Sequence, residues 1–88
     1  MSVALTVVIP AYNEGDGIVP VLDRIFDAVE SDCEIFVVVD FEEDTTVPVL
    51  AAYREHEPRL HTLVNTYGRG PANAIRYGID QVRPRSSW

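Results

Sequence analysis

The chain has 88 residues, of which 47% are hydrophobic, enough for one compact domain with a folded core rather than a disordered segment. Its 14 acidic and 7 basic residues give a formal net charge of −7, which argues against a nucleic-acid binder, and no apolar run reaches the ~20 residues of a membrane span. The single cysteine, Cys33, excludes an internal disulfide and cannot build a zinc site by itself, so we expect a small, soluble, cytoplasmic domain.

The first predicted strand covers residues 4–10 (ALTVVIP), a nearly continuous apolar run that is largely β-branched. A helix follows, because the apolar residues between positions 18 and 29 recur at the spacing of one helical face. Asp16 or Gly17 is expected to cap this helix, and Pro20 then falls in its first turn, where proline is tolerated.

The second strand is predicted at residues 34–40 (EIFVVVD), followed by a helix that starts at Thr46 as its N-cap and ends before Pro58. A weaker third strand at residues 60–65 (LHTLVN) precedes a helix that opens at Pro71. Residues 83–88 are expected to form an irregular tail. The apolar face of the third helix would consist of Ala74, Ile75, Gly78, Ile79 and Val82.

Strand and helix therefore alternate three times, and the apolar residues of the strands are continuous, as in parallel strands buried on both faces. Since crossovers between parallel strands are right-handed, this order predicts an open Rossmann-like three-layer α/β/α half-domain with three parallel strands and three helices over residues 1–82. Ligands bind such sheets at the carboxyl ends of the strands, where the loops 11–17, 41–46 and 66–70 meet. Any chemistry is expected in those loops.

The first loop (PAYNEG, residues 10–15) combines an aromatic ring, an amide and a carboxylate. The ring of Tyr12 can stack on a nucleobase, and the carboxylate of Glu14 can accept hydrogen bonds from ribose hydroxyls. A plain Asn-Glu-Gly turn with an exposed tyrosine is an equally weighted alternative.

The second loop (DFEEDTT, residues 40–46) begins with Asp40, whose carboxylate at the end of its strand can accept hydrogen bonds from a base imide or from ribose. Asp44 is expected to order the turn into the following helix or to cooperate with the Thr46 cap. Glu42 and Glu43 are interpreted as solvated surface.

The third loop (NTYGRGPAN, residues 65–73) places two glycines around Arg69 just before a helix. Glycine allows close backbone approach, the helix start offers unpaired N–H groups, and Arg69 adds positive charge, so the segment predicts a phosphate-binding turn. It matches neither the dinucleotide fingerprint nor the P-loop, and taken alone it is a weak signal. His56 and His61 lie on different elements without matched ligands, so neither a metal-binding nor a catalytic role is expected for them.

Taken together, the three loops resemble the N-terminal part of family 2 glycosyltransferases, the inverting nucleotide-sugar enzymes with the GT-A fold. Residues 7–14 (VVIPAYNE) are similar to the opening motif of that family almost letter for letter. Residues 34–44 (EIFVVVDFEED) resemble its EIIVVDDGSTD, and residues 65–79 (NTYGRGPANAIRYGI) resemble its N-x-G-x-G-A-A-x-A-x-R-x-G. Order and spacing agree over residues 4–82, and within the family the chain most resembles polyprenyl-phosphate sugar synthases similar to dolichol-phosphate mannosyltransferase.

The resemblance implies the nucleotide-binding half of a glycosyltransferase, with a UDP- or GDP-linked sugar donor and, in that subfamily, a polyprenyl phosphate acceptor. In the family pattern, Asp40 matches the second aspartate of a pair whose first position is Val39 here. Arg69 matches a basic position near the diphosphate. Phe41-Glu42-Glu43 stands where the family has Gly-Ser-Thr, which changes the shape and charge of that loop. The nucleotide-binding residues that the resemblance implies are Pro10, Ala11, Tyr12, Glu14, Asp40 and Arg69.

The family's Mg²⁺ or Mn²⁺ is held by an Asp-x-Asp motif after a fourth strand, and its general base lies further on. Neither is found in this sequence, so we expect no catalytic residue here and no turnover by this truncated version of the domain. Without a fourth strand, residues 6–9 would form an open apolar edge at which the chain could self-associate. A longer parent protein could be associated with a membrane.

Two alternatives stay open. A non-catalytic fragment that serves only as a binding or interaction module agrees with the missing metal motif. A sugar-1-phosphate nucleotidyltransferase is less favoured, because those enzymes carry a motif resembling GGxGTRL near the start and a downstream lysine. This chain has Tyr-Asn-Glu there and no lysine.

Overall fold

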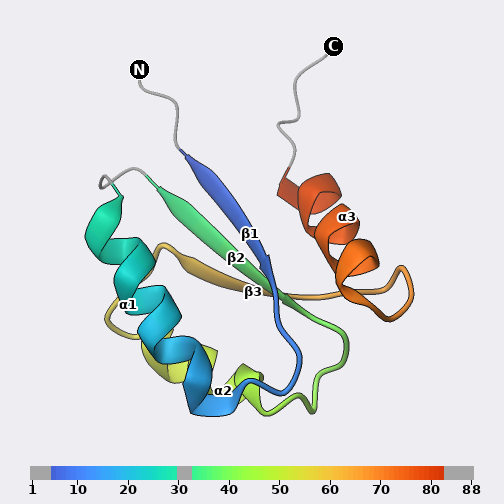
Figure 1. The fold of residues 1–88 in the computed structure, drawn as a ribbon, viewed down its shortest axis with the longest axis horizontal. Helices are drawn as coiled ribbons and strands as arrows, with labels where there is room; N and C mark the ends of the chain where they lie inside the picture. The colour runs from blue at the N-terminus through green and yellow to red at the C-terminus, as the bar shows by residue number, and fades with distance from the viewer. Residues whose placement is uncertain (1–4, 30–32, 83–88) are drawn as a thin grey trace.

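The computed structural model describes residues 5–29 and 33–82, so the predicted tail at 83–88 lies outside the described residues. Three parallel strands form one sheet in the order β1-β2-β3, with bounds Thr6–Pro10, Glu34–Val39 and Leu60–Val64. A 3-10 turn, η1 (Gly15–Gly17), leads into the first of three helices, and the helices are α1 (Ile18–Ala28), α2 (Thr46–Arg54) and α3 (Pro71–Val82). The predicted α/β half-domain is confirmed (Figure 1).

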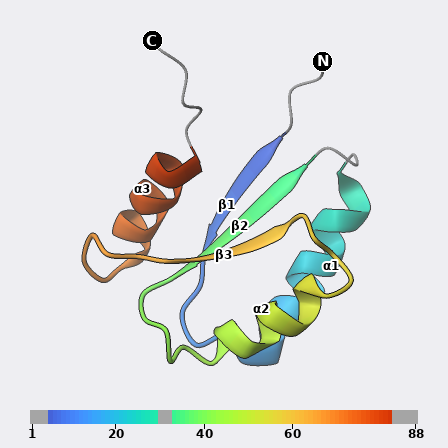
Figure 2. The same ribbon diagram turned by 180° about the vertical axis from the view of Figure 1, so that it is seen from behind.

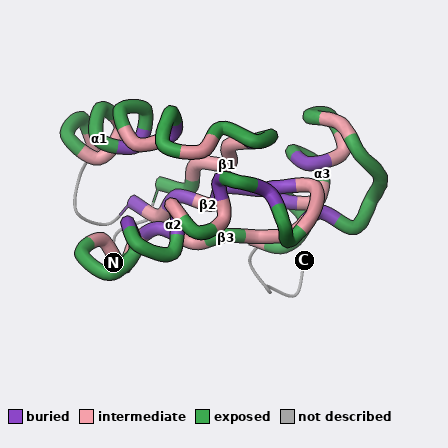
Figure 3. Tube along the Cα trace, turned by 90° about the horizontal axis from the view of Figure 1, so that it is seen from below, coloured by how far each residue is buried: buried purple, intermediate pink, exposed green. Residues whose placement is uncertain are grey.

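The helices lie on both faces of the sheet, with α1 and α2 on one side and α3 on the other (Figures 1 and 2). Ile35, Val37 and Val39 of β2 belong to the hydrophobic core with residues of α1 and α2. Val38 faces the opposite way, towards α3, and it is also fully buried. The central strand is therefore covered on both faces, as its continuous apolar run predicts, and buried residues concentrate along it (Figure 3).

Helix α3 approaches the sheet closely at Gly78. A Cβ atom there would lie 2.5 Å from Val8 Cγ1 and 2.9 Å from Val38 Cγ2, and no such contact is sterically allowed without a shift. The expectation that Ile75 and Ile79 face inward is wrong, since they are 38% and 49% exposed. The smallest residues of the apolar stripe line the contact with the sheet, and the two isoleucines flank it.

Strand β1 pairs with β2 alone among the residues that the structure describes, and it lies at one edge of the sheet as expected. The N–H of Ala11 and the carbonyl of Leu5 both form hydrogen bonds with β2, so the odd-numbered residues of β1 direct their N–H and carbonyl groups towards β2. In a parallel pair the alternate residues turn theirs outward, and here these are Thr6, Val8 and Pro10. Self-association at this edge stays a prediction.

The expected role of Thr46 as the N-cap of α2 is wrong. Thr46 is the first helical residue, and Thr45 precedes it without a side-chain cap. The hydroxyl oxygen of Thr46 instead accepts a hydrogen bond of 2.9 Å from the backbone N–H of Glu14. A residue expected to serve its own helix therefore joins α2 to the first loop.

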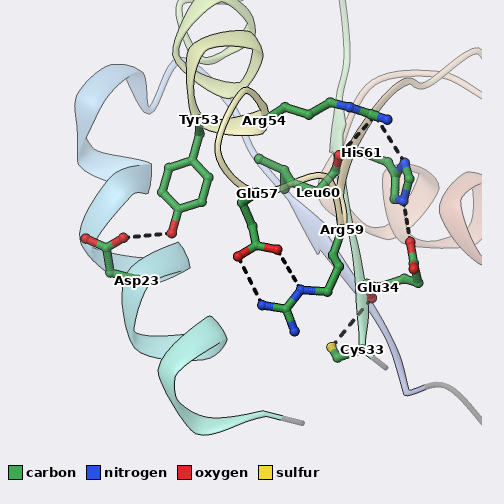
Figure 4. A network of polar contacts seen from close by, with 9 residues as sticks. All are labelled: Asp23, Cys33, Glu34, Tyr53, Arg54, Glu57, Arg59, Leu60 and His61. Carbon is green, nitrogen blue, oxygen red and sulfur yellow. Dashed lines mark hydrogen bonds and ion pairs between the residues drawn. The ribbon is translucent and has the colours of Figure 1, made fainter. Parts of the chain in front are cut away.

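Polar contacts join α2 to the sheet at the end where β2 and β3 begin (Figure 4). His61 lies between Arg54 and Glu34, with Arg54 Nη1 3.3 Å from its Nδ1 and Glu34 Oε1 2.5 Å from its Nε2. Because a guanidinium only donates, Nδ1 accepts and Nε2–H donates to the Glu34 carboxylate. His61 therefore links α2, β2 and β3. Within residues 5–29 and 33–82, no helix has the length and apolar character that crossing a bilayer requires.

Candidate functional site

A pocket of about 470 Å³ lies at the carboxyl ends of β1 and β2, beside the start of α3. This volume is typical of small-molecule sites, and the position is the one expected for ligands in an open α/β sheet. A second hollow of about 540 Å³ lies between α1 and α2 and contains none of the predicted residues. The first pocket contains all six of them, since its lining is Pro10, Ala11, Tyr12, Glu14, Asp40, Arg69, Gly70, Pro71 and Ala74.

The side chain of Asp44 holds the first loop in place through hydrogen bonds. Its carboxylate is fully buried and accepts hydrogen bonds from the backbone N–H of Asn13 at 2.8 Å and of Thr46 at 2.7 Å. The bond to Thr46 confirms the expectation that Asp44 orders the turn into α2. The bond to Asn13 was not foreseen, and it ties the Tyr-Asn-Glu turn to the start of α2.

Asn13 gives the first loop its sharp turn. Its φ of 47° lies in the left-handed region, which asparagine tolerates better than most residues. Its side-chain Oδ1 accepts a hydrogen bond of 3.2 Å from the N–H of Thr45, which adds a second link to the start of α2. The turn leaves Tyr12 58% exposed at the rim of the pocket, where its ring is available to a ligand.

Protonation of Asp44 is expected to lower the free energy of unfolding at acidic pH. Burial alone would raise the pKa of Asp44, but hydrogen bonds from the Thr46 side chain and from the Asn13 and Thr46 backbone outweigh it and hold the pKa below the ordinary 3.8. The carboxylate therefore contributes its full stabilisation above pH 3.8, and this is lost as the pH falls through the lower folded-state pKa.

We expect the free energy of unfolding of the wild type to fall more steeply below pH 3.8 than that of Asp44→Asn, which has no carboxylate to protonate. Urea unfolding at a series of acidic pH values measures both slopes. Identical slopes in this window would contradict the lowered pKa.

Asp40 connects the end of β2 to the third loop. Its Oδ1 accepts a hydrogen bond of 2.9 Å from Asn65 Nδ2, and its Oδ2 accepts one of 3.1 Å from the N–H of Gly70. The Gly70 carbonyl in turn accepts from the N–H of Ala74, so the carboxylate lies at the positive end of α3. Asp40 lines the pocket as predicted, and it also holds the Gly-Arg-Gly turn in place.

Asn65 organises the third loop, although it is not among the residues predicted for the site. It is 6% exposed, donates from Nδ2 to Asp40 and to the Gly68 carbonyl at 2.6 Å, and accepts at Oδ1 from the N–H of Tyr67 at 2.8 Å. The available signal was an asparagine directly after a strand and before a glycine-rich turn, which is typical of a side chain that bonds the backbone two residues on.

Phe41 is the second residue that the sequence analysis did not assign to the site. Its ring meets that of Tyr12 edge to face, with centroids 6.0 Å apart at 68°, and the guanidinium carbon of Arg69 lies 5.6 Å from its centroid. Phe41 itself does not line the pocket, but both of its partners do. Three residues from three different loops therefore form one continuous row, which we call the Tyr12–Phe41–Arg69 row.

The described residues do not by themselves fit the divalent metal that the resemblance implies. Such ions take several oxygen ligands. Within residues 5–29 and 33–82, no group of three His, Cys, Asp or Glu residues is placed to hold a metal ion. The pocket offers the carboxylates of Glu14 and Asp40, and both oxygens of Asp40 already accept hydrogen bonds from the third loop.

The model of the family described as Glycosyl transferase family 2 matches residues 6–85. No curated protein and no solved structure gives a significant match. The matched segment runs from β1 through α3 and includes the three loops and every residue that lines the pocket. The chain therefore belongs to glycosyl transferase family 2.

Proposed function

We propose that this chain is the nucleotide-binding half of a glycosyltransferase and that its pocket holds the nucleoside diphosphate of the sugar donor. The observation that supports this proposal is a single pocket of about 470 Å³, which is lined by an exposed aromatic ring, two carboxylates and an arginine at a helix start. Membership of the family supports a nucleotide-sugar donor in general.

Each loop supplies a group suited to one part of a nucleotide. Tyr12 stacks on the base, and Glu14 accepts hydrogen bonds from ribose hydroxyls. Asp40 accepts from the ribose or from a base imide with the lone pairs that the third loop leaves unused. Arg69 and the N-terminus of α3 face the diphosphate.

The charge of the chain opposes diphosphate binding. A net charge of −7 repels a polyanion, and a helix N-terminus offsets only ~0.3–1 kcal/mol at an exposed site. We therefore expect affinity to increase when Mg²⁺ or Mn²⁺ is present to neutralise the diphosphate.

In the complete transferase, an acceptor oxygen attacks the anomeric carbon of the sugar while the nucleoside diphosphate leaves, with general-base help. We propose that this chain binds the donor and does not turn over by itself. The finer proposal is a cytoplasmic, dolichol-phosphate mannosyltransferase-like enzyme with UDP or GDP as donor nucleotide and polyprenyl phosphate as acceptor.

Calorimetric titration with UDP and with GDP, each with Mn²⁺, tests the site. We expect one of them to bind, and Tyr12→Ala to weaken it about 5- to 150-fold, because base–aromatic stacking is worth ~1–3 kcal/mol. The matched control is Tyr67→Ala, which removes another exposed ring that does not line the pocket. A folded chain that binds neither nucleotide would overturn the proposal, and equal losses in both variants would remove Tyr12 from the site.

A further inference from the structure

We infer that Phe41 is a positioning residue that holds Arg69 over the pocket with its charge unneutralised, so that Arg69 can pair with the diphosphate. The inference rests on the proposed function and adds a residue to it. Phe41 stands where the family pattern has a glycine, so the row described above is a feature of this chain's own second loop.

Arg69 lies against an aromatic ring although carboxylates line the same pocket. Acidic residues dominate the neighbouring loops, with Glu14 and Asp40 lining the same pocket. Nevertheless, Arg69 forms no ion pair with any described residue, and its guanidinium lies over the face of Phe41. The long side chain is exposed, so without a partner it would lose rotamer freedom on binding a ligand.

An aromatic ring and a carboxylate hold an arginine with different consequences. A carboxylate would occupy the N–H donors of the guanidinium and compete with a phosphate for them. A ring attracts the cation through its face and leaves those donors free. Phe41 therefore restrains Arg69 at 5.6 Å while keeping it able to form bidentate bonds to a diphosphate.

This geometry predicts that the effect of Phe41 depends on the charge of the ligand. The attraction between a cation and a ring at an exposed site corresponds to about a two- to fivefold change in affinity. Phe41→Leu keeps an apolar side chain of similar size but lacks the ring. We therefore expect it to weaken UDP by that factor and to change the affinity for uridine, which has no phosphate, much less.

The experiment is calorimetric titration of the wild type and of Phe41→Leu with uridine and UDP, or with guanosine and GDP if GDP binds. Phe26→Leu is the matched control, because Arg59 lies 4.7 Å from that ring at the opposite end of the strands. It removes an Arg–Phe contact without touching the pocket and should change neither affinity. Equal losses for nucleoside and nucleotide, or no loss with UDP, would overturn the inference.

A second measurement without ligand separates this inference from the proposed function. In wild-type protein, the ring current of Phe41 should shift the NMR resonances of the Arg69 side chain, and Phe41→Leu should abolish that shift while Phe26→Leu retains it. Arg69 resonances unchanged by Phe41→Leu would overturn the inference even if nucleotides bind. A wild type that shows the shift and binds no nucleotide would overturn the proposed function and leave the positioning of Arg69 supported.

Discussion

Replacing Asp44 with alanine is expected to lower the free energy of unfolding by about 3 kcal/mol and to weaken nucleotide binding. The variant leaves two N–H groups without their acceptor, that of Thr46 in a buried site and that of Asn13 in a partly buried one. Each buried donor that loses its partner costs ~1–3 kcal/mol. The first loop then keeps its bonds to Thr45 and Thr46 but loses the one to Asp44, so the turn that positions Tyr12 and Glu14 is held less firmly. Urea unfolding and calorimetric titration with UDP or GDP measure the two effects.

Glu43→Ala is the control for this variant, because it removes the same charge one residue earlier from an exposed side chain. Exposed substitutions of this kind usually change stability by no more than ~0.5 kcal/mol. Asp44→Asn should fall between the two, since an amide keeps one acceptor oxygen. Equal stability of the Asp44→Ala and Glu43→Ala variants would contradict the role given to the buried carboxylate.

Gly78→Ala is expected to destabilise the chain by about 2 kcal/mol, although alanine is the better helix former. The added Cβ would lie 2.5 Å from Val8 and 2.9 Å from Val38, so α3 must move away from the sheet. Overpacking costs ~1–3 kcal/mol, and the short distance to Val8 places this contact at the upper end of that range. The higher helix propensity of alanine offsets ~1 kcal/mol of this cost. In a domain of this size the loss lowers Tm by roughly 10 °C. Thermal unfolding followed by circular dichroism measures it.

Gly17→Ala provides the comparison, because a Cβ at Gly17 meets nothing within 4 Å and its φ of −63° suits any residue. We expect a change within ~0.5 kcal/mol, since a poorer N-cap and a less flexible unfolded chain act in opposite directions. A Gly78→Ala variant as stable as the wild type would show that α3 can shift without loss.

The fold could be predicted because its determinants are local. The continuous apolar run of β2, the prolines in the first helical turns and the alternation of strand and helix all appear in short stretches of sequence. The periodicity of α3 also identified its apolar stripe. It could not show that Gly78 would form the contact and Ile75 and Ile79 would flank it, because that depends on how closely Val8 and Val38 approach.

The residues that line the pocket could be predicted for a related reason, since parallel strands bring their following loops to one edge. The supporting contacts could not. Asp44 and Asn13 are 31 residues apart in sequence, and Arg69 meets Phe41 from a different loop. Nothing in either segment alone indicates its partner. The sequence therefore indicated which side chains line the pocket, and the structure was needed to show what holds them.

The two bonds of Asp40 to the third loop limit how the specificity of this pocket can evolve. A substitution at Asp40 would remove the acceptor of Asn65 Nδ2 and of the Gly70 N–H as well as the acceptor proposed for a ligand, so it would disturb the turn that carries Arg69. The side chain of Glu14 forms no hydrogen bond within the described residues, so its replacement should have no such secondary effect. Under the proposed function, we therefore expect donor selectivity to change gradually through Glu14, whereas a change at Asp40 would require a compensating change in the third loop.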